Sequence, residues 1–435
     1  MRPLNRPMTE IGNTHKRLLS LILAGVLAAG ALVGCGQATP AAEEADQTAA
    51  VFASWSEVEE AGRDQTVTIL MWGGNELVNT YMDTTVSSYL KETYNITLNR
   101  VPMNPPDYLS LLLNEKTAGV AEGSADLLWI NAENFRTAKE GGLLWGPYDQ
   151  LLENQTKYYE TSAGDLNSDS GIPIEGMEAI WGRAQLVLTT DTARVEAPPK
   201  SYKALLEWAK ANPGRFTYPN PMEDFAGSAF VRSALYELTG ESDWSADLTE
   251  EAFKEKAQPV FDYFNELKPY LWREGTVYPS SQAQLDELFK NNEVDFTIGF
   301  ELGKTAGQVA AGAYPETAEA YVFDTGTIGN AHYLAVPFNA PQKAAALLTI
   351  NALQSPELQL EKFKPAVWGD MPAFDAAALS EEEQAALKAI EAEVFPMPLE
   401  ALAERRLPEL KAVYIDWIEM LWSEIAGASN RAGAK

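Results

Sequence analysis

Short strand-like apolar runs alternate with helical repeats from about residue 65 onward. The strand-like runs in the first part of the chain are 67–72, 96–101 and 125–130. Between them, apolar residues recur at helical spacing over 77–86 and from Leu109. Gly73-Gly74-Asn75 breaks the first run, and Pro102 stops the second. This order of strand, helix, strand, helix and strand predicts an α/β domain with a parallel sheet.

The middle of the chain repeats the pattern. Strands are expected at 184–190, 215–218, 293–298 and 332–336. Ser201 is the expected N-cap of a helix that runs to Ala211, and a helix over 228–238 has Gly240 just past its end. Ser355 and Pro356 open a further helix, and 399–425 is mostly helical. Two α/β units of similar size predict two lobes with a ligand cleft at the carboxyl ends of their strands.

The N-terminus carries a secretion signal. A basic stretch up to Arg17 precedes an apolar segment over 18–33, and Gly34-Cys35 follows that segment. This order is typical of a signal peptide, and the segment is too short and too rich in Gly and Ala for a good membrane-spanning helix. The ending is similar to the lipobox of bacterial lipoproteins, which implies that Cys35 is lipidated and begins the mature chain. Two acyl chains anchor stably where one does not.

Composition describes a folded, acidic protein without disulfides. Hydrophobic residues make up 46% of the chain, and Cys35 is its only cysteine. The net charge is −29; without 1–34, 29 basic and 61 acidic residues remain. Such a surface repels nucleic acid and anionic lipid headgroups. It is either an ordinary solvated surface or a field that attracts cationic solutes.

The usual catalytic motifs are missing from the sequence. Beyond the signal segment there is one histidine, His332, and no nucleotide-binding, zinc-protease or serine-hydrolase motif. Zinc sites that need several His or Cys ligands are excluded. A carboxylate-dependent surface hydrolase, such as a glycosidase, stays open as the alternative, although the many acidic residues single out no pair. We therefore expect no catalytic residues, no bound metal and no cofactor.

Several long stretches resemble YnjB-type solute-binding proteins of ABC importers. They are 71–75, 78–79, 126–139, 213–219, 227–232 and 324–341. The likeness runs in order from about residue 65 to at least 375. It implies a type II periplasmic-binding-protein fold, in which two α/β lobes close over one small solute by a hinge motion. It also implies a permease and a separate ATPase as partners, and no enzymatic activity.

The expected solute contacts follow strands, begin a helix or fall in the family-like stretches. They are Trp72, Gly73, Gly74, Asn75, Asn131, Asn134, Phe135, Trp181, Tyr218, Ser228, Phe300, Glu301, Asn330 and His332. Aromatic walls with a few amide groups are typical of small-molecule pockets, and aromatic faces also hold cations. Each aromatic is alternatively a core residue, the glycine pair a tight turn, and His332 a packed side chain.

The predicted organisation has four parts. A signal peptide spans 1–34 and a flexible tether 35–58, rich in Ala, Gln, Thr and Glu. Lobe 1 comprises 59–177 with 325–362, and lobe 2 comprises 178–324 with 363–425. We expect a monomer, held by lipid alone on the outer face of the cytoplasmic membrane, or on the periplasmic side in a two-membrane cell.

Overall fold

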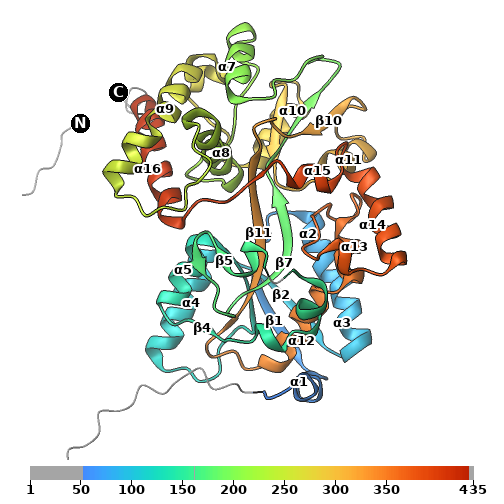
Figure 1. Ribbon diagram of the computed structural model, residues 1–435. Helices are drawn as coiled ribbons and strands as arrows, with labels where there is room; N and C mark the ends of the chain where they lie inside the picture. Colours follow the sequence, from blue (N-terminus) through green and yellow to red (C-terminus); the bar gives the residue numbers. More distant parts are fainter. Residues whose placement is uncertain (1–51, 161, 431–435) are drawn as a thin grey trace, which may run out of the picture. The chain divides into compact units, whose positions relative to one another are not determined.

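Two β-sheets organise the residues that the computed structural model describes, which are 52–160 and 162–430, with side chains up to 425 (Figure 1). The signal peptide, Cys35 and most of the predicted tether lie outside them. The tether's predicted end needs correction, because Trp55–Val58 begin helix α1 (Trp55–Gly62). Ser54 caps this helix by accepting from the Glu57 N–H, and Val58 is fully buried. Within the described ranges, no helix is both long and apolar enough to cross a membrane.

The larger sheet has seven strands, ordered β12-β11-β3-β1-β2, with β4 and β7 also paired to β11. Its strands are β1 (Thr66–Met71), β2 (Thr97–Pro102), β3 (Leu127–Ile130), β4 (Leu144–Trp145), β7 (Ala179–Gln185), β11 (Thr327–Pro337) and β12 (Arg406–Leu407). The predicted parallel sheet is confirmed here, because β1 pairs in parallel with both β2 and β3. Strand β11 runs antiparallel to β3 and β7.

The smaller sheet has the order β10-β8-β9, with β8 (Val187–Asp191), β9 (Phe296–Gly299) and β10 (Ala318–Tyr321). Both of its strand pairs are antiparallel, so the predicted repeat of a parallel sheet is wrong for this part. The physical reason is that β8 directly continues β7 after Leu186, so the crossing from the other sheet sets its direction. The predicted strand at 215–218 is also wrong, because these residues form no strand.

Helices cover both faces of the larger sheet and surround the smaller one (Figure 1). The remaining α-helices are α2 (Glu76–Thr80), α3 (Ser87–Tyr94), α4 (Pro105–Ala118), α5 (Ala132–Glu140), α6 (Glu153–Tyr158), α7 (Tyr202–Ala211), α8 (Phe225–Thr239), α9 (Glu250–Leu267), α10 (Gln282–Lys290), α11 (Lys304–Ala310), α12 (Lys343–Leu353), α13 (Pro356–Phe363), α14 (Glu381–Val394), α15 (Leu399–Ala403) and α16 (Ala412–Asn430). A π-helix, η1 (Tyr81–Val86), joins α2 to α3, and β5 (Ser168–Asp169) pairs with β6 (Ile172–Pro173). Short 3₁₀ turns are η2 (Asp149–Leu151), η3 (Gly164–Leu166), η4 (Lys268–Tyr270), η5 (Trp272–Gly275) and η6 (Ala376–Ala378).

The alternation of side chains along β1 explains why the larger sheet is buried on both faces. Val67, Ile69 and Met71 pack into one hydrophobic cluster together with α12 and η1. Leu70 points to the opposite face, into a cluster that includes residues of α4 and α5. Strands buried on both faces read as continuous apolar runs, which is how 67–72 appeared in the sequence.

Several predicted helix ends are confirmed, and one is wrong. Ser201 caps α7 and Ser355 caps α13 through their hydroxyls. Gly240 ends α8 in the left-handed conformation, with a φ of 70°. That helix, however, begins at Phe225, not at Ser228, and is capped by Asp224. The carboxylate of Asp224 accepts from the N–H groups of Ala226 and Gly227.

Two segments connect the sheets. The first runs from β7 through Leu186 into β8, and the second leaves β10 and enters β11. The chain therefore changes sheet at Leu186, whereas the predicted division placed the lobe boundary between 177 and 178. That division into lobes stays a prediction.

The buried side chain of Glu178, just before β7, predicts how stability depends on pH. Both of its carboxylate oxygens are buried and have no hydrogen-bond partner among the described residues. Burial, helped by the nearby charge of Asp169, raises the pKa of Glu178 well above its ordinary value. Burial also raises the pKa of Asp169 to about 7. A carboxyl group of this kind contributes stability below its unfolded pKa, and that contribution is lost as the pH rises through the folded pKa.

We expect the melting temperature of the wild type to fall between about pH 5 and pH 8, and that of Glu178→Gln to fall less, because the amide cannot ionise. Calorimetry across this range checks it. Glu60→Gln, at an exposed position of α1, is the control and should follow the wild type. Equal slopes for Glu178→Gln and the wild type would contradict the prediction.

Candidate functional site

The loops that follow β1 and β9 meet, although they lie far apart in the sequence. The side-chain amide of Asn75, after β1, donates to Oε1 of Glu301, after β9, over 3.3 Å. The Asn75 side-chain oxygen also caps α2 by accepting from the Leu77 N–H at 2.9 Å. Asn75 is therefore fixed to the larger sheet while its amide reaches the loop of the smaller one. This contact brings together two of the predicted site residues.

Glu301 also accepts a hydrogen bond from a residue on the side of the smaller sheet. The Nε2 of Gln282, at the start of α10, donates to Oε2 of Glu301 over 3.0 Å. Beside it, the ring of Phe300 lies 5.2 Å from that of Phe225, between centroids. Phe225 is 38% exposed and Trp72, on the other loop, is 43% exposed. The two loops thus offer a carboxylate, an amide and accessible aromatic rings.

Gly73 and Gly74 have a local packing reason for being glycine. A Cβ on Gly74 would lie 2.3 Å from the ring of Trp72, and one on Gly73 would lie 2.8 Å from the Cβ of Pro102. The pair lets the Trp72 ring lie directly against the backbone. The side chain of Asn79 fixes the same turn by donating to the Gly73 carbonyl at 3.0 Å.

The start of α5, after β3, presents Asn131 and Asn134 with partly exposed side chains. Asn131 is in the N-cap position but makes no capping bond with its side chain. The carboxylate of Asp169 instead accepts from the N–H of Ala132, which has a φ of 51°. This left-handed conformation is unusual for a residue with a Cβ, and the bond to Asp169 holds it. The amide of Asn134 donates to Glu133 at 3.1 Å.

Helix α5 of the larger-sheet side contacts α16, which packs with the smaller sheet. Arg136 and Asp416 form an ion pair across this contact, with 3.2 Å between nitrogen and oxygen. Glu133 lies one turn before Arg136, and Glu419 lies one turn after Asp416. Burial raises the pKa of Glu133, and burial also raises the pKa of Glu419, to which the charge of Glu133 adds. Two partly buried carboxyl groups, one on α5 and one on α16, are therefore close enough for their charges to interact.

The charge of Arg232 on α8 acts on both carboxyl groups, but Arg232 is paired with another carboxylate. It donates to both oxygens of Glu409, over 2.9 and 2.7 Å, and its third nitrogen donates to the hydroxyl of Ser228 at 2.5 Å. That hydroxyl donates to Glu419 at 2.7 Å. Four carboxylates therefore face two guanidinium groups, and with every group ionised the cluster carries two negative charges in excess.

The remaining predicted contacts, apart from His332, are buried. Phe135, Trp181 and Tyr218 are at most 1% exposed, each in a different hydrophobic cluster. The hydroxyl of Tyr218 accepts from the indole N–H of Trp422 at 3.0 Å. These three aromatic side chains are core residues here and offer no surface to a solute. Ser228 is also buried, within the ionic cluster.

Asn330 and His332, on β11, have protein partners. Asn330 is 8% exposed, and its side-chain oxygen accepts from the Ala331 N–H at 2.6 Å. The Nε2 of His332 lies 3.0 Å from Asp370, and the imidazole stacks on Trp368 with 5.9 Å between centroids. The structure thus brings Asn75 and Glu301 together, with Trp72 and Phe300 on the same loops, and places His332 in a structural network.

That network is centred on a buried ion pair. The Nζ of Lys362 lies 2.7 Å from Asp370, and these side chains are at most 1% exposed. Burial raises the pKa of Asp370, but Lys362 and then His332 outweigh it and hold the pKa below its ordinary value. Burial lowers the pKa of Lys362, even beside Asp370. Lys362 also donates to the Trp181 carbonyl at 2.7 Å.

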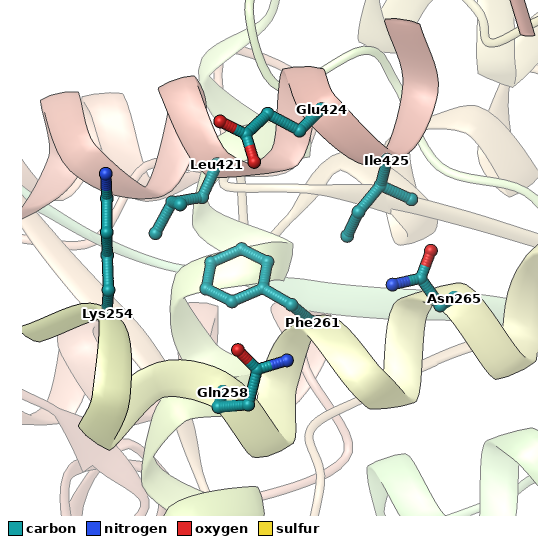
Figure 2. A pocket seen from close by; sticks show the side chains of 7 residues that line it. All are labelled: Lys254, Gln258, Phe261, Asn265, Leu421, Glu424 and Ile425. Carbon is teal, nitrogen blue, oxygen red and sulfur yellow. The ribbon is translucent and has the colours of Figure 1, made fainter. Parts of the chain in front are cut away.

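Two surface hollows lie away from the predicted residues. One has a volume of about 390 Å³ and lies between α9 and α16. Figure 2 shows its apolar side chains, Phe261 on α9 and Leu421 and Ile425 on α16. Lys254, Gln258, Asn265 and Glu424 complete its lining. The other, of about 560 Å³, includes Ser201, Tyr236 and Thr325. Neither is lined by any predicted contact.

Sequence reasoning missed Glu133, Arg232, Gln282, Glu409 and Glu419. Glu133 and Arg232 fall inside the family-like stretches 126–139 and 227–232, so a search of those stretches for charged residues would have found them. The two glutamates of the C-terminal part had no such signal.

Comparison with protein families matches residues 84–391 to the family model described as bacterial extracellular solute-binding protein. Among curated proteins, Protein YnjB of Escherichia coli (strain K12) is 36% identical over 367 residues. That match covers 84% of this chain and 93% of the relative.

Solved structures share the fold at low identity. Maltose-bound MalE3 of T. maritima superposes with a TM-score of 0.65 at 15% identity, over 84% of this chain and 95% of that one. The spermidine/putrescine ABC transporter substrate-binding protein PotD of Streptococcus pneumoniae gives 0.59 at 16% identity, over 84% and 99%. The fold is therefore the two-lobed, type II periplasmic-binding-protein fold.

The buried ion pair leads to a prediction. Replacing Lys362 with Met leaves the carboxylate of Asp370 buried beside a neutral side chain, which costs about 3–5 kcal/mol. We expect Lys362→Met to lower the free energy of unfolding by that amount in urea titrations.

Lys364→Met is the matched control, because Lys364 is exposed and pairs with Glu361 at the surface. Its effect should stay below about 1 kcal/mol. Similar losses for the two variants would mean that the buried pair has no special role.

Proposed function

We propose a cationic solute for this chain, which belongs to the family of bacterial extracellular solute-binding proteins. The captured solute carries at least one positive charge. The chain is the substrate-binding subunit of an ABC importer and works with a permease and an ATPase. It is not an enzyme, so the alternative of a surface hydrolase is set aside. What the family leaves open is the solute, and the charges between the lobes bear on it.

The observation that carries the proposal is the excess of carboxylates between α5, α8 and α16. Arg232 and Arg136 form their ion pairs with Glu409 and Asp416, so among the described residues Glu133 and Glu419 form no ion pair with a Lys or Arg. Burying such charges without a counterion is costly. A cationic solute would supply the counterion, since a unit charge about 4 Å from a carboxylate gains about 4 kcal/mol at an effective dielectric constant of about 20.

The loops that follow β1 and β9 support the same solute class. Glu301 is a further carboxylate, and the accessible rings of Trp72, Phe225 and Phe300 are surfaces on which cations bind favourably. Asn75, Asn131 and Asn134 add amide donors and acceptors. We propose these residues, together with Glu133 and Glu419, as the solute contacts. Phe135, Trp181 and Tyr218 are left out because they are core residues.

The fold alone does not choose the solute. Of the similar structures, one is named for spermidine and putrescine and another holds maltose. The fold therefore accommodates both a polyamine and a neutral sugar. The carboxylates of this chain favour the first kind of ligand.

We further propose that the protein is a monomer anchored through Cys35. The lipobox-like ending at Cys35 supports lipidation, and residues up to 51 provide the length of a tether. Anchoring would confine the binding lobes to a thin layer beside the permease and raise their effective concentration there. The solute would be captured on the outer face of the cytoplasmic membrane.

The solute class is tested by thermal-shift measurements on the chain that begins after Cys35. Spermidine and choline are the cationic probes, and maltose and phosphate are the neutral and anionic ones. A ligand at 100 times its dissociation constant stabilises the folded state by about 2.7 kcal/mol. We expect a shift with at least one cation. Shifts only with maltose or phosphate, or with none of the four probes, would refute the proposal.

A variant tests the role of Glu301 in the same site. We expect Glu301→Gln to weaken binding of the responding cation about tenfold or more, equivalent to about 1.4 kcal/mol, in isothermal titration calorimetry. Glu316→Gln, at an exposed position of the same lobe, is the control and should bind like the wild type. Equal affinity for Glu301→Gln would remove Glu301 from the site.

The anchor is tested by Cys35→Ala. Without the thiol there is no atom to acylate, so we expect the variant to leave the membrane fraction while the purified protein binds solute unchanged. Immunoblotting of membrane and soluble fractions measures this. Retention of the variant in the membrane fraction would overturn the anchor assignment.

A further inference from the structure

The loop that carries Glu301 is anchored immediately after it. Leu302 is fully buried in the hydrophobic cluster that also contains Phe363 and Met371. The N–H of Gly303, which precedes α11, donates to the carbonyl of Gly369 over 2.9 Å. A loop that follows a strand of the smaller sheet is therefore packed against the segment 364–371, which follows α13.

At this contact two glycines approach each other too closely for any side chain. A Cβ on Gly303 would lie 2.6 Å from the Cα of Gly369, and a Cβ on Gly369 would lie 2.6 Å from the Cα of Gly303. Ordinary contacts of a Cβ begin near 3.4 Å. Gly303 has a φ of −83°, which any residue adopts. Its lack of a side chain is required by the approach and not by its backbone conformation.

The other side of the contact is fixed to the crossing strands. The N–H of Gly369 donates to the carbonyl of Lys362 over 3.0 Å. The next residue, Asp370, is the buried partner of Lys362 and His332. The carbonyl of Met371 accepts from the Arg183 N–H of β7 over 3.1 Å. Segment 364–371 is thus held by β7, β11 and α13. Its backbone contact with Gly303 therefore fixes where Gly303 lies.

We propose that Gly303 and Gly369 are positioning residues, and that their backbone contact holds the Glu301 loop at the distance from Asn75 that the solute site requires. The inference rests on the proposed function, since it takes Glu301 and Asn75 as site residues. Binding sites need their groups held within about 0.5 Å. A single methyl group at position 303 would push the loop by more than that, because 2.6 Å must widen to about 3.4 Å.

The test measures the distance between the two loops without any solute. Asn75→Cys and Glu301→Cys are introduced together with Cys35→Ser, so that the chain has no other cysteine. A short bismaleimide then crosslinks the two thiols at a rate that depends on their approach. We expect Gly303→Ala in this background to lower the crosslinking rate at least fivefold. A rate within twofold of the parent would overturn the proposal.

The matched control is Gly164→Ala, since a Cβ there meets no atom within 4 Å. It should crosslink like the parent. If Gly303→Ala does not fold, the pair Gly369→Ala and Gly312→Ala replaces it. Both have a positive φ, 78° and 69°, but only Gly369 has close neighbours. A slower crosslinking rate for Gly369→Ala than for Gly312→Ala supports the proposal. Equal crosslinking rates, or loss of folding in both variants, overturn it.

A purely structural role would lower the melting temperature of Gly303→Ala but leave the crosslinking rate of the folded protein unchanged. That result would also overturn the proposal. Because no solute is present, failure of the cation proposal in the thermal-shift measurements would not change the crosslinking result. The two proposals can therefore fail separately.

Discussion

The antiparallel pairing of β7 with β11 is the constraint on which the rest of the structure depends. Both strands belong to the larger sheet, and each continues directly into or out of the smaller one, through Leu186 and from β10. Leu186 extends the pairing by donating to the Ile328 carbonyl over 2.9 Å. These two connections between the sheets therefore lie side by side. Hinge motions in such folds are confined to a few residues of this kind.

Buried and partly buried charged groups occur in two different arrangements in this fold. At the crossing, Lys362 and Asp370 are fully buried, and the pair is neutral and completed by His332 and backbone carbonyls. Between α5 and α16, by contrast, Glu133 and Glu419 are only partly buried and form no ion pair with a Lys or Arg in the described part of the chain. The first arrangement holds the framework together. The second leaves an excess of negative charge at the proposed solute site, and this links the acidic character of the chain to its proposed solute.

Local patterns in the sequence predicted most elements but not the details that depend on packing. Ser201 and Ser355 were predicted as caps and are caps. The helix expected to begin at Ser228 begins instead at Phe225, because Asp224 accepts the first N–H groups of α8. Aromatic residues after strands were predicted as ligand contacts, yet Tyr218 is in a core. Cores and solute pockets use the same aromatic residues, so sequence position alone cannot separate them.

By itself, the sequence determined most of the order of strands and helices, the parallel sheet that contains β1, β2 and β3, the expectation of a lipidated Cys35, and the family. These follow from patterns within a few residues or from long matching stretches. Only the tertiary structure decided the antiparallel direction of β8 to β10, the pairing of Arg232 with Glu409, and the approach of Gly303 to Gly369. The reason is physical: each of these contacts joins residues that lie far apart in the chain, so its geometry is set by how whole elements pack.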